Sequence, residues 1–402
     1  MTMYQYTAWA VDDHEVFKST CDAPSENAVR SKLKRVGYTV DAVSPLKKSL
    51  LFGQRKRVKL QDIVSVCRRF SIMYRAGLNL MDCLSLLAKE NESQRLSEIL
   101  LDIHGTIERG SKIADAFSKY QNVFSPLFVN MIRAGEISGK LDYVLDEAAT
   151  YLEKQYDLRR KIQQALAYPV VVMVVIFAVV TAIMFFVVPV FSEVYMKLDI
   201  VLPLATRILI SLSNNAIYIF PTIAALIVGL WITYIKLQPI PKAKKYLDKA
   251  KLSFPTVGPV YHKILLLRFI RTLCVTIKAG LELPEAIAIA EDVADNAVIS
   301  EASGMIHRSI KRGGTITDGV SLHGFFPQII THAFAVGEKA GELSETLTRF
   351  SDSIEKDVDI DIKKLITKLE PAIVIALTLI VGFIAIAIYL PIFDLMKLMR
   401  SA

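Results

Sequence analysis

Hydrophobic and polar positions follow three patterns along this 402-residue chain, and each pattern predicts a different kind of structure. Near the N-terminus, apolar and polar residues alternate from Tyr4 to Trp9, which is typical of a half-buried strand. From Leu60 onward, apolar residues recur with the period of an amphipathic helix. Three long windows contain no Lys, Arg, Asp or Glu, and each is long enough to cross a membrane as a helix. These windows are Ile162–Ser192, Ile208–Ile235 and Pro371–Phe393.

The first 46 residues predict a small α+β module. Asp12-Asp13-His14 is expected to form a turn before a second strand at Glu15–Cys21. Ser25 can cap a helix that ends at Gly37, and a third strand follows at Tyr38–Val43. The basic segment 47–59 is more often a solvated tether than a lipid contact. Because no positive region followed by an apolar run begins the chain, we expect no signal peptide.

The helical part of the chain contains an internal repeat. Ala76-Gly77-Leu78 ends a predicted helix, and Ala279-Gly280-Leu281 ends a similar one roughly two hundred residues later. A Gly-Glu-x-x-Gly-x-Leu motif then precedes an apolar window in each copy. Between the two motifs the correspondence shifts by one residue, which predicts a deletion in the second copy near 313–326. The sequence therefore predicts two homologous helical bundles.

The charge distribution predicts how the chain crosses the membrane. The net charge is +8, and the basic residues crowd beside the apolar windows, which fits lipid and the positive-inside rule better than nucleic acid. Both bundles and the N-terminus are therefore expected in the cytoplasm, and the C-terminus in the periplasm. Prolines 169, 189, 371 and 391 are expected at the edges of the spans, where a missing N–H costs least. The predicted segments are the module 1–46, linker 47–59, first bundle 60–161, span 162–192, periplasmic loop 193–207, span 208–235, basic linker 236–260, second bundle 261–369, span 370–393 and periplasmic tail 394–402.

The two Gly-Glu-x-x-Gly-x-Leu motifs predict tight helical hairpins. In the first copy, Ser125 caps a helix that starts at Pro126 and ends at Ala134, with Gly135 in the left-handed position. Gly139 is expected to allow a close passage of the chain, and Glu136 to interact with the positive end of the following helix. A repeated acidic residue at a bundle tip is equally consistent with a docking contact. The candidate partner-contact residues are Gly135, Glu136, Gly139 and Leu141, with Gly337, Glu338, Gly341 and Leu343 in the second copy.

The sequence offers no catalytic constellation. The stretch around Lys140 resembles a phosphate-binding loop only superficially, because the glycine spacing is short and Leu141 replaces the required Ser or Thr. The six histidines show no helical pairing typical of metal ligands. The four cysteines show no metal-like spacing and are expected to be reduced core thiols. We therefore expect no enzyme, no cofactor and no metal site.

Several of these motifs together resemble a known family, the inner-membrane platform proteins of bacterial type II secretion and type IV pilus assembly. The resemblance rests on FSPLFVNMIRAGEISGKL and YLEKQYDLRRKIQQALAYP in the first copy. In the second copy it rests on RFIRTLCVTIKAGLELPEAI, VGEKAGEL and KLEPAIVIALTLIVGFIAIAIYLPIFDL. It covers residues from about 60 to 396 and has the same three-span layout.

This resemblance implies an all-α polytopic membrane protein with two homologous cytoplasmic helical bundles, three transmembrane helices and a non-enzymatic scaffold role. Its implied partners are a hexameric cytoplasmic assembly ATPase, pilin or pseudopilin subunits and other inner-membrane assembly proteins. A homo-oligomer and contact with membrane lipid are also expected, but no nucleic acid. An oligomeric membrane transporter component remains the alternative, although the spans lack the ionisable groups that solute pathways usually contain. A membrane receptor is a weaker alternative, because the loop 193–207 is too short to form a ligand-binding domain.

Overall fold

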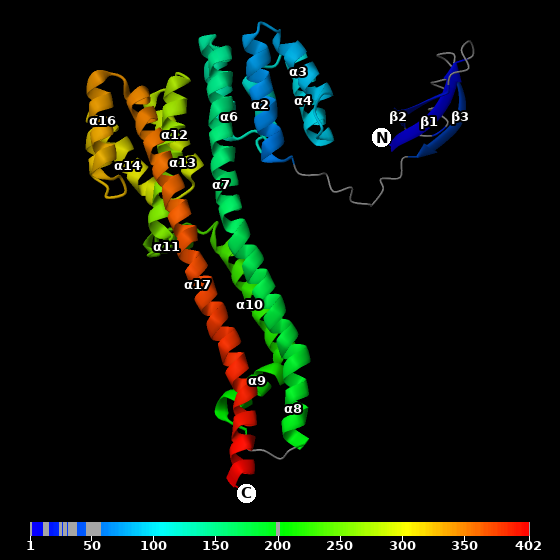
Figure 1. Cartoon of the computed structure of the whole chain (residues 1–402). Helices are drawn as coiled ribbons and strands as arrows, with labels where there is room; N and C mark the ends of the chain where they lie inside the picture. Colours follow the sequence, from blue (N-terminus) through cyan, green and yellow to red (C-terminus); the bar gives the residue numbers. More distant parts are fainter. Residues whose placement is uncertain are drawn as a thin grey trace. The chain divides into compact units, whose positions relative to one another are not determined.

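The structure is a computed structural model of the whole chain (Figure 1). It describes residues 2–10, 16–23, 26, 30, 38–45, 58–197 and 202–401. The chain separates into two units, Met1–Val58 and Lys59–Ala402, which we describe one at a time.

The first unit contains a three-stranded antiparallel sheet. Its strands are β1 (Thr2–Ala10), β2 (Val16–Ala23) and β3 (Tyr38–Pro45), in the order β2-β1-β3. The register pairs Tyr4 with Cys21 and Tyr6 with Val43. The helix predicted between Ser25 and Gly37 falls largely outside the described residues, so the α+β assignment stays a prediction.

The second unit begins with a helical bundle that matches the first predicted repeat. Four phenylalanines meet in its core: the Phe117 ring packs on Phe124 and Phe128 at centroid distances of 4.8 and 5.4 Å, and Phe70 packs on Phe117 at 6.5 Å. Burial of such apolar and aromatic side chains is the main driving force for packing the short helices together. The bundle contains α2 (Leu60–Arg75), α3 (Leu80–Lys89), α4 (Gln94–Glu108), α5 (Ile113–Ser118), α6 (Pro126–Ser138) and the first part of α7 (Leu141–Ala182).

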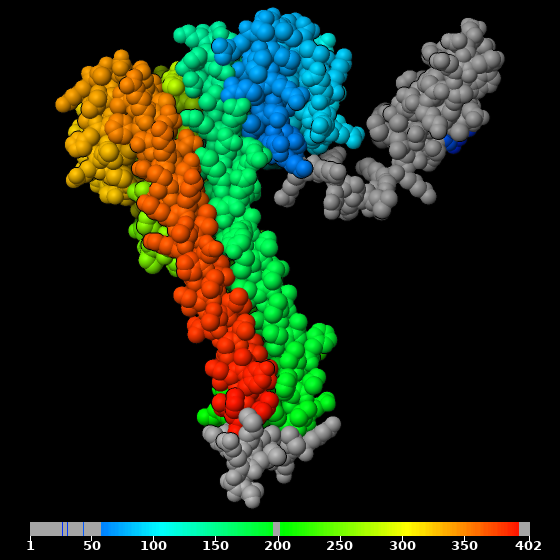
Figure 2. Space-filling view, viewed as in Figure 1, coloured from blue at the N-terminus to red at the C-terminus, as the bar shows by residue number. Residues whose placement is uncertain are grey.

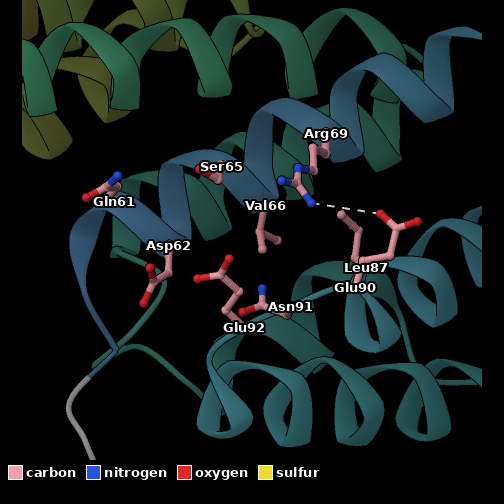
Figure 3. A pocket seen from close by; sticks show the side chains of 9 residues that line it. All are labelled: Gln61, Asp62, Ser65, Val66, Arg69, Leu87, Glu90, Asn91 and Glu92. Carbon is pink, nitrogen blue, oxygen red and sulfur yellow. Dashed lines mark ion pairs between the residues drawn. The ribbon is translucent and has the colours of Figure 1, made fainter.

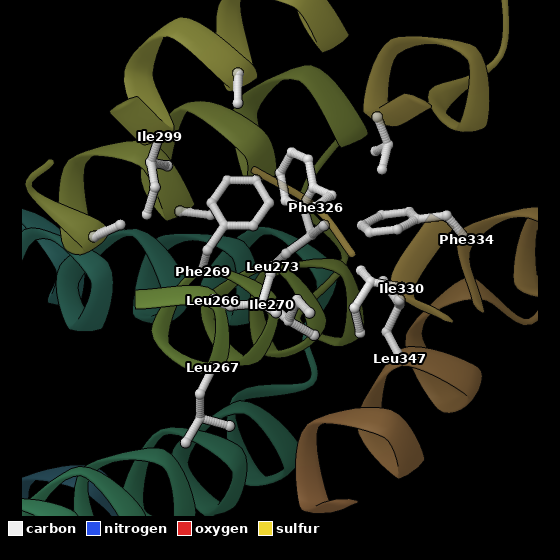
Figure 4. Packing of buried hydrophobic residues seen from close by; sticks show 14 of the residues in the cluster. Leu266, Leu267, Phe269, Ile270, Leu273, Ile299, Phe326, Ile330, Phe334 and Leu347 are labelled. Carbon is white, nitrogen blue, oxygen red and sulfur yellow. The ribbon is translucent and has the colours of Figure 1, made fainter. Parts of the chain in front are cut away.

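The second bundle repeats this order of helices. Figure 4 shows part of its core, in which Phe269, Phe326 and Phe334 lie among aliphatic side chains. The helices α5 and α15 begin at equivalent positions, whereas Phe326 comes one residue early relative to Phe124, so the missing residue lies between Ser321 and Phe326, within the predicted region. The helices are α12 (Gly258–Lys278), α13 (Leu283–Ala294), α14 (Ala297–Lys311), α15 (Ile316–Ser321), α16 (Gln328–Ala340) and the first part of α17 (Leu343–Ser401).

Three helices are long and apolar enough to span a membrane, as predicted. The first runs through Leu141–Tyr195 as α7, a short π-helix η1 (Ile183–Val187) and α8 (Val188–Lys197). The second is α10 (Ala216–Leu237), and the third is Leu343–Phe393 of α17. We refer to Leu141–Tyr195 and Leu343–Phe393 as the two stems. Figures 1 and 2 show the stems lying side by side below the bundles, and α7 and α17 pack directly on one another.

The second apolar window differs from its prediction. The window 208–235 was expected to be one span, but the helix breaks at Asn215, so that α9 (Leu204–Asn214) is separate from α10. Asn215 occupies the end of α9, and its side-chain amide donates to the Ser211 carbonyl at 2.8 Å, a local hydrogen bond that competes with the regular helix pattern. Leu209 of α9 packs instead with Val188 and Ile384 of the two stems.

The segments that flank the spans are also more helical than expected. The basic linker 236–260 contains helix α11 (Pro241–Ser253), which packs on the second bundle. Lys244 pairs with Asp295 at 2.5 Å, and the buried Asp248 accepts a hydrogen bond from the Ala297 amide at 3.1 Å. The tail 394–402 was predicted to be separate from the third span, whereas α17 continues to Ser401.

Candidate functional site

The first Gly-Glu-x-x-Gly motif forms the turn between α6 and α7. The Ser125 hydroxyl accepts a hydrogen bond from the Phe128 amide at 3.3 Å, and Pro126 lies in the first turn, as predicted. The helix then continues to Ser138, and Gly139 ends it with a φ of 67°. A positive φ strongly favours glycine.

The second motif has the same geometry. Helix α16 ends at Ala340, and Gly341 has a φ of 71°. The Glu342 amide donates to the Gly337 carbonyl at 3.0 Å, and α17 starts at Leu343. Both copies therefore use the second glycine of the motif to close a hairpin between a short helix and a stem.

The roles predicted for the two glycines were wrong. Gly135 lies inside α6 and is buried, and Gly139 takes the left-handed position. A Cβ atom on Gly135 would lie 3.0 Å from the Val144 Cβ, so the first glycine provides the close approach between helices. On Gly337 it would lie 2.9 Å from the Leu343 Cα. Either glycine can adopt a positive φ, and only the packing of the stem decides which one does.

The two glutamates cap short helices instead of interacting with the stems. Glu136 accepts hydrogen bonds from the amides of Ile113 (3.0 Å) and Ala114 (3.2 Å), the first two residues of α5. Glu338 accepts from the amides of Ile316 (2.9 Å) and Thr317 (3.2 Å) at the start of α15. The expected attraction to the positive end of a helix is therefore present, but the helix was wrongly assigned.

Thr317 distinguishes the second glutamate from the first. Its hydroxyl adds a 2.7 Å hydrogen bond to Glu338, and Ala114 offers no such group to Glu136. Both glutamates are half-buried. Their carboxylates thus have a structural use in both copies.

The accessible part of each hairpin lies between the predicted site residues. Leu141 is buried and Leu343 is half-buried, whereas Gly139 and Gly341 are exposed. Ile137 is 80% exposed, an unusual environment for an aliphatic side chain at a helix end. Ile137 is not among the predicted contact residues, although an isoleucine between polar residues at a turn is a recognisable signal. The contact role of the eight predicted residues stays a prediction.

A second polar surface lies on the first bundle, where α2 meets the end of α3 (Figure 3). It is a notch of about 210 Å³, and the carboxylates of Asp62, Glu90 and Glu92 line it. Arg69 pairs with Glu90 at 3.8 Å. Within the part of the chain that the structure describes, no cluster of three or more His, Cys, Asp or Glu side chains is placed to hold a metal ion.

The two bundles are joined by polar contacts between the stems. Lys154 pairs with Asp352 and Lys161 with Asp359, each at 2.6 Å. The Tyr151 hydroxyl, which is buried, bonds to the Thr272 hydroxyl at 3.1 Å and connects α7 to the first helix of the second copy. Burial raises the pKa of Tyr151, and the nearby Arg268 and Arg271 act in the opposite direction.

Pro189 and Pro391 occupy equivalent positions in the two stems, and both lie within helices. Both prolines lie near the ends of the apolar windows, as predicted, but they are inside helices and do not mark helix ends. A proline inside a helix leaves a carbonyl of the preceding turn without its N–H partner. In the third span the carbonyl released by Pro391 is that of Ala387, and the Thr206 hydroxyl donates to it at 2.5 Å.

Another hydroxyl follows this pattern. Ser213 donates at 2.6 Å to the carbonyl of Met184, whose partner in the π-helical pattern would be position 189, a proline. Because unpaired carbonyls are costly within a membrane, the Thr206 and Ser213 hydroxyls explain how the prolines are tolerated. Tyr195 also donates to a carbonyl nearby, that of Ile388, at 2.5 Å, but no proline occupies the position that would pair with this carbonyl.

Comparison with known proteins identifies the family. The model for "Type II secretion system (T2SS), protein F" matches residues 66–189 and 269–391, one match in each copy. The chain belongs to this family.

Individual relatives come from both kinds of machine. The type IV pilus assembly protein PilC of Thermus thermophilus is 34% identical, over 84% of this chain and 83% of its own length. The PilC of Myxococcus xanthus is 31% identical, over 94% of this chain and 91% of its own length. The type II secretion system protein F of Vibrio cholerae is 26% identical, over 87% of this chain and 86% of its own length. This is a family of secretion and pilus platform proteins rather than a known enzyme family, and together with the three apolar helices it supports an inner-membrane location.

Proposed function

We propose that this protein is the inner-membrane platform of a type IV pilus or type II secretion machine. In this role it couples a hexameric cytoplasmic assembly ATPase to the polymerisation of pilin or pseudopilin subunits and to protein export. The observation that carries the proposal is the pair of helices that run from the bundles into the apolar windows without a break. A continuous helix rises 1.5 Å per residue and can transmit displacement along its whole length.

The contacts between the stems support joint movement. Lys154 with Asp352 and Lys161 with Asp359 hold the two stems at two levels, and Tyr151 with Thr272 ties a stem to the opposite bundle. A force on one bundle is thereby passed to both spans. Work done by a partner on the bundles would reach subunits in the membrane in this way.

The proposed orientation places both bundles and the N-terminus in the cytoplasm and the C-terminus in the periplasm. Its support is the basic flanks of the spans, including α11 next to α10. Reporter fusions test it: a periplasmic reporter should be active after Ser401, and a cytoplasmic one after Ser253. The reverse result at either site would make a cytoplasmic motor unable to reach its bundle.

Co-purification from native membranes tests the coupling. We expect the ATPase and pilin-like subunits to be recovered with the tagged protein in constant ratios. The candidate contacts are Gly135, Glu136, Gly139 and Leu141, with Gly337, Glu338, Gly341 and Leu343. Glu136→Gln and Glu338→Gln are the informative variants, because glutamine keeps one capping oxygen but removes the charge. Unchanged recovery of the partners would remove the glutamates from the contact set.

A variant at Ile137 separates the hairpin surface from the bundle fold. Ile137→Asp changes an exposed side chain, so we expect normal folding and weaker recovery of the ATPase.

The alternative function, an oligomeric transporter component, predicts solute flux in proteoliposomes that contain this protein alone. Absence of both co-purified partners, together with such flux, would favour the transporter.

A further inference from the structure

A cavity of about 550 Å³ lies where the stem of the first copy meets the second copy. Helix α7 forms one wall and α12 the other, and Leu60 at the start of α2 contributes to the lining. Of its lining residues, only Tyr151 has a part in the function proposed above. Its lining residues are Leu60, Tyr151, Gln155, Leu158, Arg159, Ile162, Gln163, Ile264, Leu267, Arg268 and Arg271.

The lining is strongly cationic. Arg159, Arg268 and Arg271 face the cavity, and no carboxylate is among the lining residues. Arg271 pairs with Glu355 at 2.7 Å, which leaves two guanidinium groups with no ion pair in the described part of the chain. Three arginines without a lining acid are suited to an anion, and guanidinium geometry matches a phosphate group in particular.

Comparison of the two copies shows that this charge is specific to the junction. The equivalents of Leu60 and Arg159 in the second copy are Lys263 and Asp361, which form an ion pair at 2.6 Å. In the first copy Leu60 stands in place of the lysine, and Arg159 stands in place of the aspartate. The substitution removes a carboxylate and leaves Arg159 available.

Arg271 also retains an unused donor. Its equivalent in the first copy, Arg68, holds both oxygens of Glu153 through Nε and a terminal nitrogen. Arg271 contacts Glu355 through one terminal nitrogen, and its Nε has no hydrogen-bond partner although the residue is only 7% exposed. Buried donors without a partner are rare, so the second copy leaves this arginine less fully paired than Arg68 is in the first.

The remaining lining is mainly aliphatic, with the Gln155 and Gln163 amides among it, and one end of the cavity adjoins the first uncharged window. Leu158, Ile162, Ile264 and Leu267 contribute aliphatic surface, and Ile162 is the first residue of the first uncharged window. In Figure 4, Leu267 points away from the second core and toward the neighbouring helices. The cavity thus combines cationic and aliphatic surfaces next to the start of a predicted span, where anionic lipid headgroups are expected.

We propose that this cavity binds the phosphate headgroup of an anionic phospholipid, with Arg159, Arg268 and Arg271 around the phosphate and the aliphatic residues against the start of an acyl chain. A bound lipid would fill the junction between the copies. A free phosphate shares the headgroup chemistry but makes no use of the aliphatic surface.

Titration of the purified full-length protein in detergent tests the proposal. The probes are dioctanoyl phosphatidylglycerol, dioctanoyl phosphatidylcholine and inorganic phosphate, and the readout is the dissociation constant from thermophoresis. We expect saturable binding of phosphatidylglycerol, at least about tenfold tighter than of phosphatidylcholine, and a loss of about tenfold or more in the Arg159→Gln/Arg268→Gln variant. Arg160→Gln is the matched control, because it removes the same charge from the next residue of α7 and does not line the cavity.

Three results would overturn the proposal. Equal binding of the two lipids would show that the cavity does not recognise an anion, and equal weakening by Arg160→Gln would show surface attraction only. Inorganic phosphate that binds as tightly as phosphatidylglycerol would make a soluble anion the ligand. If the double variant does not fold, Arg159→Gln alone decides the question, because Arg159 is exposed. None of these readouts depends on pilus or secretion partners, so the proposed function is tested separately.

Discussion

The two copies of the repeat agree at their hairpins and differ at their junction. Both hairpins have a left-handed second glycine, a buried first glycine and a glutamate that caps a short helix. At the junction, the fork between Arg68 and Glu153 becomes a single contact between Arg271 and Glu355. The shared features are those that each bundle needs in order to fold. The differences at the junction lie where the copies must fit against one another, which is where we infer a ligand.

Glycine substitutions should reduce the free energy of unfolding most, and they test whether the two hairpins are packed equally tightly. In Gly337→Ala the new Cβ meets backbone at 2.9 Å, whereas in Gly135→Ala it meets a side-chain carbon at 3.0 Å and backbone at 3.2 Å. We expect the free energy of unfolding to fall by about 3 kcal/mol in Gly337→Ala and by about 2 kcal/mol in Gly135→Ala, because packed helices must separate. Thermal unfolding of the full chain in detergent measures both.

Gly139→Ala is the control for this pair. A Cβ there meets nothing within 4 Å, so only the strain of a positive φ remains, about 1 kcal/mol. If Gly139→Ala were the most damaging of the three, the assigned roles of the two glycines would be reversed.

Removal of the capping glutamates should have the next largest effect. Glu338→Ala leaves two amides and the Thr317 hydroxyl without their acceptor, and Glu136→Ala leaves two amides. We expect the free energy of unfolding to fall by about 2–3 kcal/mol in Glu338→Ala and by about 1–2 kcal/mol in Glu136→Ala. Glu342→Ala, at an exposed position, should be nearly silent in the same unfolding assay. Equal effects of all three variants would argue against capping.

Cysteine titration compares the first helices of the two copies. Burial raises the pKa of Cys67 and of Cys274 to about 12 from an ordinary value of 9.0. The unfolded thiols ionise above pH 9 and the folded ones do not, so the stability from each neutral thiol is fully present below pH 9 and is lost as the pH rises toward 12. At pH 10 each thiol should reduce the free energy of unfolding by about 1.4 kcal/mol relative to pH 8.

Cys67→Ala and Cys274→Ala isolate this effect, because each should remove its own share of the decline above pH 9. In the native protein Cys67 and Cys274 should also resist alkylation at pH 8 and react only after unfolding. Rapid alkylation of either residue in the native protein, located by peptide mapping, would contradict the burial. Cys67, Cys83 and Cys274 are buried free thiols, as the sequence predicted, and the side chain of Cys21 lies outside the described residues.

Removal of a hydroxyl donor from the apolar helices should cause the smallest loss in the free energy of unfolding. Thr206→Val removes the donor to the Ala387 carbonyl and should cost about 0.6–1.5 kcal/mol. In a Pro391→Ala background the helix supplies its own N–H to that carbonyl, so the same substitution should cost much less. A double-mutant cycle measures this coupling. Equal costs in the two backgrounds would show that the hydroxyl does not compensate for the proline.

The sequence predicted the duplication, the all-helical bundles and the three apolar helices, because each depends on a local and repeated pattern. The roles of Gly135 and Gly139 were not predictable, since both positions accept a positive φ and only the close approach of Leu141 and Val144 to Gly135 distinguishes them. Glu136 caps a helix that lies more than twenty residues earlier, a long-range contact that no spacing reveals. The break at Asn215 was hidden by the apolar residues on both sides of it.

The ion pairs between the stems have a geometric consequence. Lys154 and Lys161 are about two helical turns apart, and Asp352 and Asp359 have the same separation on the opposite helix. Sliding one stem along the other by a single turn would bring each lysine opposite the wrong residue and break both bonds at once. The two ion pairs therefore favour a single alignment of the stems along their common axis. Motions in which both stems tilt or turn together keep both ion pairs intact.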